Sequence, residues 1–88
     1  MILRETSKFS KLRKKVKSQT ERDALKAAVI AIRDNPLIGK KLKGELDRLR
    51  SYSYQAVGQA RRIIYLFDPD QDAITFFSFG PRQGIYKE

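Results

Sequence analysis

In the first half of the chain, apolar residues recur every three or four positions, which is typical of amphipathic helices. The first stripe consists of Phe9, Leu12 and Val16, and the second of Leu25, Ala28, Val29 and Ile32. Ser7 is a suitable N-cap for the first helix, and Thr20 with Asp23 resembles a capping box for the second. Asn35-Pro36 ends the second helix. The predicted linker is only a residue or two long, so we expect an antiparallel helical hairpin.

The second half of the chain has the apolar runs and turn residues of β-structure. Four segments are predicted to be extended: 46–50, 52–57, 61–67 and 73–79. The third is a near-continuous apolar run, which is typical of a buried central strand. It is predicted to pair with the fourth, which is rich in aromatic residues, across a turn at 68–72. Gly58-Gln59 is the turn candidate between the second and third.

With a short strand at residues 2–5, these elements predict an α+β fold of order β-α-α-β-β-β. A helical hairpin would pack on one face of a small antiparallel sheet. A chain of 88 residues is the size of one domain, so we expect residues 1–88 to form a single unit. The apolar runs are too short to span a membrane, and MILRETSKF lacks the apolar core of a signal peptide. We therefore expect a cytoplasmic protein with no membrane contact.

Positive charge is concentrated in the first half of the sequence. The formal net charge is +9, and residues 1–50 hold 15 Lys and Arg against 6 Asp and Glu, whereas residues 51–88 hold 4 of each. A one-sided basic surface attracts polyanions, so nucleic acid is the expected partner. The charge is also compatible with an acidic protein partner, or with solubility alone.

The chain contains neither cysteine nor histidine. Their absence excludes disulfides, cysteine-based zinc sites and catalysis by Ser-His or Cys-His pairs. The clustered aspartates of the segment DPDQD (68–72) flank a proline, which is typical of a turn rather than of a metal site. We therefore expect no metal and no other cofactor.

Three arginines in the second half are candidates for contact with a phosphate. Arg61 and Arg62 are adjacent in a predicted strand, so their side chains should point to opposite faces of the sheet. One of them should lie on the face without helices, although an arginine at a strand start also snorkels to solvent. Arg82 follows Gly80-Pro81, a stiff backbone that would aim its planar fork. A surface ion pair with Glu88 is the alternative.

Tyrosines and further basic residues complete the set of candidates. Tyr86 would either plug the core or place its phenol in a nucleotide site. Tyr54 shares a strand face with Tyr52, and aromatic side chains interleaved with cations are typical of single-stranded RNA binding. Burial in the core would explain these tyrosines equally well. The remaining candidates for RNA contact are Lys40, Lys41, Lys43, Arg48, Arg50 and Arg61, although most such charges lie on solvated surfaces.

Three motifs, in order, resemble the RelE/ParE toxin superfamily. They are LKGEL (42–46), RRIIY (61–65) and FGPRQGIY (79–86). The resemblance implies the toxin of a type II toxin–antitoxin pair, with a β-α-α-β-β-β fold and a cognate antitoxin as partner. In the RelE branch, it implies cleavage of mRNA in the ribosomal A site by attack of a 2′-OH on the adjacent phosphate.

The same resemblance assigns catalytic roles to three residues. Arg62 and Arg82 would stabilise the scissile phosphate, and Tyr86 would orient the attacking ribose, with Tyr54 as the alternative for this last role. Two departures leave the general base open: the chain has no histidine, and Tyr52-Ser53-Tyr54 stands where relatives often carry strand lysines. A lysine from 40, 41 or 43 is the candidate base, because arginine does not lose its proton near neutral pH. Two alternatives remain: a ParE-like inhibitor of DNA gyrase, which is not an enzyme, and a basic nucleic-acid-binding module.

Overall fold

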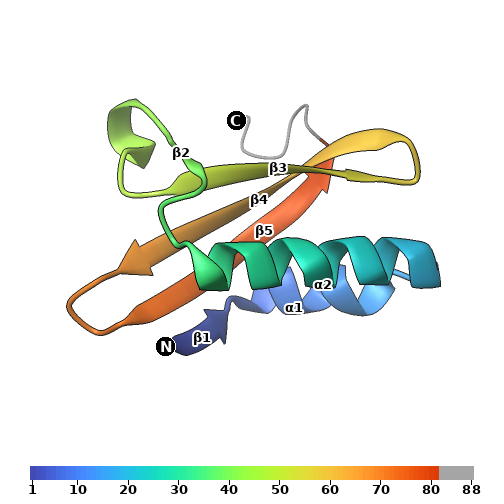
Figure 1. Ribbon diagram of the computed structural model, residues 1–88, viewed down its shortest axis with the longest axis horizontal. Helices are drawn as coiled ribbons and strands as arrows, with labels where there is room; N and C mark the ends of the chain where they lie inside the picture. The colour runs from blue at the N-terminus through green and yellow to red at the C-terminus, as the bar shows by residue number, and fades with distance from the viewer. Residues whose placement is uncertain (82–88) are drawn as a thin grey trace.

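The structure is a computed structural model that describes residues 1–81, apart from the side chain of Glu45. In this part of the chain, two helices lie on one face of a five-stranded sheet (Figure 1). The elements are β1 (Ile2–Glu5), α1 (Ser7–Lys15), α2 (Gln19–Asp34), β2 (Lys40–Lys41), the 3₁₀ helix η1 (Gly44–Leu46), β3 (Arg50–Ala56), β4 (Gln59–Asp68) and β5 (Ala73–Pro81). The predicted α+β fold and its order of elements are confirmed.

The strands lie in the order β1-β5-β4-β3-β2. Strand β1 runs parallel to β5, and the other neighbours are antiparallel, so the sheet is mixed rather than wholly antiparallel. The two-residue strand β2 was not among the extended segments predicted from the sequence. The expectation that residues 46–50 are extended is wrong except at Arg50, because η1 and a turn precede β3.

Both helices begin at hydroxyl caps slightly before the predicted positions. The Thr6 hydroxyl accepts a hydrogen bond from the Phe9 backbone N–H at 3.1 Å, and the Ser18 hydroxyl accepts one from Glu21 at 3.3 Å. The Thr6 hydroxyl also donates to the carbonyl oxygen of Phe77 at 2.8 Å. One side chain therefore starts α1 and ties it to β5.

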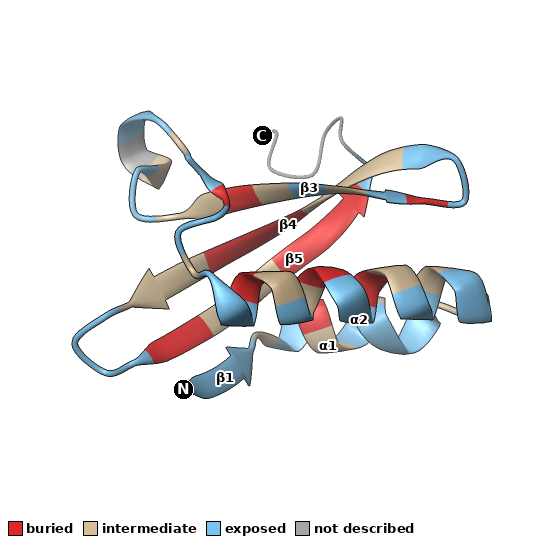
Figure 2. Ribbon diagram, viewed as in Figure 1, coloured by how far each residue is buried: buried red, intermediate tan, exposed pale blue. Residues whose placement is uncertain are grey.

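The core lies between the helices and the sheet (Figure 2). The helices contribute Phe9, Leu25, Ala28 and Ile32, and the strands contribute Ile63, Tyr65, Ile74, Phe76 and Phe79. The ring of Phe9 lies 5.1 Å from that of Phe79 and 5.5 Å from that of Phe76, measured between centroids. These aromatic contacts fix α1 over β5.

A bulge in β5 determines which of its residues reach the core. Ile64 pairs with Ser78, but the next residue, Tyr65, pairs with Phe76, so Phe77 is an extra residue in β5. The bulge allows Phe76 and Phe79 to face the helices although they are three residues apart. Strict alternation would place one of them on the opposite face.

The turn between β3 and β4 offers a test of backbone strain. Val57 and Gly58 both have positive φ, 52° and 73°, in a two-residue hairpin. A β-branched residue is disfavoured in this conformation, whereas Asn-Gly is a preferred pair for such turns. Because Val57 is 60% exposed, little packing is lost when it is replaced.

We expect Val57→Asn to stabilise the fold by about 1 kcal/mol and to raise Tm by roughly 4–8 °C. Thermal unfolding followed by circular dichroism measures this change. The matched variant Gly58→Ala should lower Tm, because it places a Cβ at positive φ. A Tm for Val57→Asn at or below that of the unaltered protein would show that the turn is not strained.

Candidate functional site

The sheet face opposite the helices carries Arg62. In the β3–β4 ladder Ser53 pairs with Arg62, and in the β2–β3 ladder Lys40 pairs with Ser51. Residues directly opposite each other in antiparallel strands point to the same face, and alternate residues of one strand do so as well. Lys40, Ser51, Ser53 and Arg62 therefore share one face. Helix η1 rises on this same side of the sheet (Figure 1).

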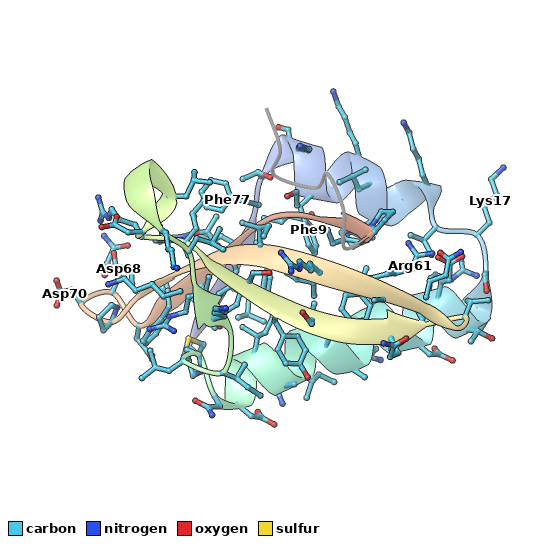
Figure 3. All side chains as sticks on the ribbon, turned by 90° about the horizontal axis from the view of Figure 1, so that it is seen from above. Phe9, Lys17, Arg61, Asp68, Asp70 and Phe77 are labelled. Carbon is cyan, nitrogen blue, oxygen red and sulfur yellow. The ribbon has the colours of Figure 1, made fainter. Side chains whose placement is uncertain are left out.

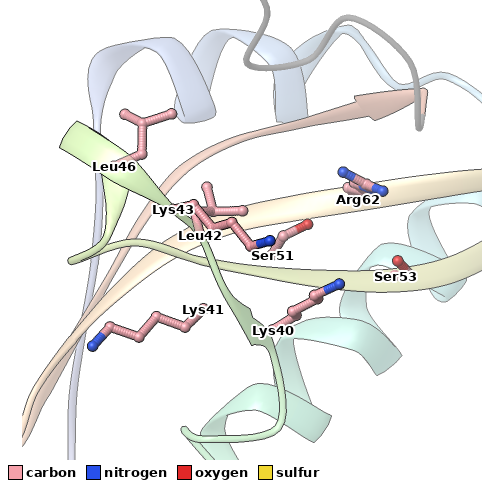
Figure 4. A pocket seen from close by; sticks show the side chains of 8 residues that line it. All are labelled: Lys40, Lys41, Leu42, Lys43, Leu46, Ser51, Ser53 and Arg62. Carbon is pink, nitrogen blue, oxygen red and sulfur yellow. The ribbon is translucent and has the colours of Figure 1, made fainter.

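These side chains surround a hollow of about 400 Å³, which we call the basic hollow (Figure 4). Its lining consists of Lys40, Lys41, Leu42, Lys43, Leu46, Ser51, Ser53 and Arg62. Figure 4 shows the amines of Lys40 and Lys43 turned toward the part of the hollow that holds the serines and Arg62, whereas Lys41 points away. The hollow thus gathers three cations and two hydroxyls, groups that bind the oxygens of a phosphate.

A network on the helix side of the sheet holds the segment before Lys40, and we call it the Tyr65 anchor. The Tyr65 hydroxyl donates to the carbonyl oxygen of Pro36 at 2.7 Å and accepts from the backbone N–H of Gly39 at 2.9 Å. Arg50 donates to the carbonyl oxygen of Gly39 at 2.8 Å. A Cβ on Gly39 would lie 2.6 Å from the Tyr65 hydroxyl oxygen, so glycine is required for this approach. The anchor therefore sets where β2 begins.

Ser51 and Ser53 lie in the basic hollow but were not among the candidates from sequence. Ser51 is 7% exposed, and its buried hydroxyl has no hydrogen-bond partner among the described residues. A buried polar group without a partner is costly, which makes this hydroxyl available to a bound group. A signal was present in the sequence, because strand alternation places Ser51 and Ser53 on the face opposite Tyr52 and Tyr54.

Arg61 and Tyr54, two of the predicted RNA contacts, lie on the helix side of the sheet. Arg61 forms an ion pair with Glu21 of α2 at 3.0 Å and donates to the Gln59 side chain at 3.3 Å. Tyr54 pairs with Arg61 across the ladder and packs against the core. The structure does not bring these two residues together with Arg62, although Arg61 is adjacent to it in sequence.

The other predicted basic contacts are divided among three places. Arg50 belongs to the Tyr65 anchor. Arg48 lines a second hollow, of about 520 Å³, whose lining includes Lys41 and the carboxylates of Asp47, Asp68 and Asp70. Figure 3 shows Asp68 and Asp70 at the end of the molecule opposite Arg61. Of the predicted lysines, Lys40 and Lys43 are those whose amines are turned into the basic hollow.

The predicted residues Arg82 and Tyr86 lie outside the described residues. The described part of β5 ends with Gly80, which pairs with Arg62, and Pro81, which pairs with Arg61. The end of β5 is therefore beside the basic hollow.

Burial of Tyr54 has a consequence for stability at high pH. Desolvation raises the pKa of the Tyr54 phenol to about 12, from about 10 in an unfolded chain. Burial also raises the pKa of Tyr65. A raised folded-state pKa means that the unfolded chain loses its proton first, so the contribution of each phenol is complete below pH 10 and is lost as pH rises.

We therefore expect the free energy of unfolding to fall between about pH 10 and pH 12, as measured by urea unfolding. Tyr54→Phe should make this fall shallower without abolishing it, because Tyr65 contributes in the same direction. An unchanged slope in Tyr54→Phe would contradict the assignment to Tyr54.

Within residues 1–81, no cluster of three or more carboxylate, histidine or cysteine side chains is placed to hold a metal ion. None of the helices described there combines the length and the apolar character needed to cross a membrane.

Comparison with known proteins places this chain in a family. The family model described as "ParE-like toxin of type II bacterial toxin-antitoxin system" matches residues 3–88. The chain therefore belongs to the ParE-like toxins, within the RelE/ParE superfamily. No curated protein matches the sequence.

Solved structures share the fold at low sequence identity. The intact Escherichia coli RelBE toxin–antitoxin complex contains a chain with a TM-score of 0.74 and 17% identity, and the match covers 93% of this chain and 96% of that one. The isolated E. coli RelE toxin matches with a TM-score of 0.72 and 16% identity over 91% and 82% of the chains. The RelBE2 complex from Mycobacterium tuberculosis matches with a TM-score of 0.64 and 22% identity over 92% and 96%.

Proposed function

We propose that this type II toxin is an endoribonuclease that cuts mRNA in the ribosomal A site and thereby inhibits translation in the cytoplasm. The observation that carries the proposal is the basic hollow, in which Lys40, Lys43 and Arg62 meet on an open sheet face. None of its described lining residues is acidic, and its lysines and Arg62 would attract an RNA phosphate. Two hydroxyls in the same hollow supply neutral hydrogen bonds.

In the proposed reaction, a ribose 2′-OH attacks the adjacent phosphorus and the bond from phosphorus to the 5′ oxygen breaks. The 2′-OH proton passes to a base, and the departing 5′ oxygen gains a proton, which leaves a 2′,3′-cyclic phosphate and a 5′-OH. Negative charge develops on the phosphoryl oxygens in the transition state. Fixed cations stabilise that charge. The chemistry requires no metal or other cofactor.

Three residues have proposed catalytic roles: Arg62, Arg82 and Tyr86. Arg62 lines the basic hollow and would bind the phosphoryl oxygens. Arg82 directly follows Pro81, where the described part of β5 ends beside this hollow, and we assign it the same role. Tyr86 would orient the attacking ribose. Ribosomal positioning of the mRNA would supply the alignment that a weak base alone does not.

A cognate antitoxin is the proposed protein partner, as in the RelBE toxin–antitoxin complexes of similar fold. A groove of about 460 Å³ between α1 and α2 has the chemistry for one. Its apolar lining is Leu3, Phe9, Leu25, Val29 and Ile30, and its basic lining is Arg13, Arg22, Lys26 and Arg33. An acidic, amphipathic segment fits such a surface. Co-expression with the neighbouring reading frame should yield a stable complex, and its absence would count against this partner.

Inhibition of DNA gyrase is the second candidate function. It is favoured by the description of the matching family as ParE-like and by the lack of lysine in β3. In that case the basic hollow would bind another polyanion or an acidic protein surface, and mRNA would stay intact.

Primer extension on translating ribosomes separates the two functions. With purified protein we expect new mRNA 5′ ends at A-site codons, and 3′ fragments that begin with a 5′-OH. Intact mRNA together with accumulated gyrase–DNA cleavage complexes would support the gyrase function instead. If neither effect is seen and overexpression is harmless, the remaining interpretation is a basic nucleic-acid-binding module.

A further inference from the structure

We infer that Lys40, at the edge strand β2, is a phosphate-contacting residue of the basic hollow, and that the neighbouring Lys41 is not. This inference rests on the proposed function and identifies one RNA contact within it. It concerns a strand of only two residues, in which adjacent lysines have the same chemistry and similar exposure. The backbone pairing distinguishes them.

The register of β2 sends the two side chains to opposite faces. Lys40 pairs with Ser51, whose strand neighbour on the same face, Ser53, pairs with Arg62. Lys41 pairs with Arg50, which pairs in turn with the core residue Tyr65. Lys40 therefore belongs to the face of Arg62, and Lys41 to the face of the Tyr65 anchor.

The spacing across the sheet would allow the long side chains of Lys40 and Arg62 to reach one phosphate, because the strand between them carries small side chains on this face. Strands β2 and β4 are two strand spacings apart, or about 10 Å. Ser51 and Ser53 lie between them, and their short side chains leave room above β3. The amine of Lys40 extends over β3 toward the side on which Arg62 lies (Figure 4). A phosphate above the serines would be within reach of both cations.

Lys41 has a different electrostatic environment. Lys41 is one of the residues that line the basic hollow, but its amine points away from Arg62 (Figure 4). Lys41 also lines the second hollow, whose charged lining is Asp47, Asp68 and Asp70 together with Lys41, Arg48 and Arg50. Three carboxylates there balance three cations, so this hollow offers an RNA phosphate no excess of positive charge, and Lys41 should contribute little to RNA binding.

The inference can be tested by removing the positive charge of Lys40 and adding one at position 53. Ser53 is exposed on the same face as Lys40 and directly opposite Arg62, so a lysine at this position should restore a cation near the same phosphate. The variants are Lys40→Met, Lys41→Met, and each combined with Ser53→Lys. Lys17→Met, in the linker between α1 and α2, controls for the loss of one charge alone.

Binding of a fluorescein-labelled 2′-O-methyl RNA hexamer, measured by anisotropy over a range of KCl concentrations, gives the slope of log K against log salt. For single-stranded RNA, loss of one phosphate contact lowers the magnitude of this slope by about 0.7. We expect that change in Lys40→Met, with recovery in Lys40→Met/Ser53→Lys. Lys41→Met and Lys17→Met should change the slope by less than about a third of this amount. Melting temperatures confirm that each variant is folded.

Equal slope changes in Lys40→Met and Lys41→Met would overturn the inference. The inference would also be overturned if Ser53→Lys restored the salt slope as fully in Lys41→Met as in Lys40→Met. Failure of the unaltered protein to bind the hexamer would overturn it as well. The 2′-O-methyl RNA lacks the attacking hydroxyl, so this result is independent of cleavage. If the Lys40-specific slope is found but ribosomal mRNA stays intact, the proposed enzymatic function fails while the assignment of Lys40 stands.

Discussion

Replacing Arg62 with methionine should lower the rate of mRNA cleavage on translating ribosomes by about 10²–10³-fold and relieve growth arrest at equal expression. Arg62 lies on the open face of the sheet, in a hollow with Lys40 and Lys43. Methionine keeps much of the length of the side chain but removes the charge and the donors that we propose bind the phosphate. Single-turnover cleavage with saturating protein measures the effect on the chemical step.

Arg61→Met is the matched control for this variant. The two arginines are adjacent, but Arg61 pairs with Glu21 on the helix side of the sheet. Its replacement should destabilise the protein by about 1 kcal/mol while cleavage by the folded fraction stays near that of the unaltered protein. Equal losses of cleavage in the two variants, or full activity in Arg62→Met, would contradict the assignment of the site to the open face.

Tyr65→Phe should produce the largest loss of stability among the conservative substitutions considered, about 2–4 kcal/mol. The hydroxyl serves as donor to Pro36 and acceptor from Gly39, and Tyr65 is 0% exposed. Removing it leaves the part-buried carbonyl of Pro36 and the buried N–H of Gly39 without this partner. We expect the Tm to fall by roughly 10 °C or more, measured by thermal unfolding.

The variant Gly39→Ala tests the same contact from the other side. Its Cβ would lie 2.6 Å from the Tyr65 hydroxyl oxygen, so we expect a loss of stability here as well. The double variant should cost less than the sum of the two single changes, because both disrupt one contact. Additive losses would show that Tyr65 and Gly39 act independently, and that the anchor does not set the position of β2.

The sequence predicted the helices and central strands because their signals are local. The apolar run 61–67 and the aromatic run 73–79 correspond to most of β4 and β5. Of the first stripe, Phe9 and Leu12 lie on α1 and Val16 is its C-cap. Helix starts were displaced by one or two residues, because several hydroxyl residues compete as caps and tertiary contacts decide among them. Thr6 is used because it also reaches Phe77.

Features that depend on pairing between distant segments were not predictable from local signals. Strand β1 lies parallel to β5, at the opposite end of the sequence, and nothing within residues 2–5 specifies that partner. The bulge at Phe77 changes which aromatic side chains face the core, and an alternating pattern does not reveal it. Strand β2 directly follows the Tyr65 anchor, which joins segments far apart in sequence.

In the candidate site, some features were predictable from local sequence and others were not. Alternation alone required Arg61 and Arg62 to point to opposite faces, but only the packing of α2, with Glu21 beside Arg61, shows which of them faces the helices. Ser51 and Ser53 were overlooked because strand alternation indicates their face but not which residues lie beside them. Their place is set by their pairing with Lys40 and Arg62.

The most direct test of the account is a cryo-electron microscopy structure of the protein on a ribosome whose A-site codon carries 2′-O-methyl groups. We predict that an mRNA phosphate lies in the basic hollow, in contact with Arg62 and Lys40 and above Ser51 and Ser53. An A-site complex in which the mRNA passes along another face, with the basic hollow empty of phosphate, would contradict the account.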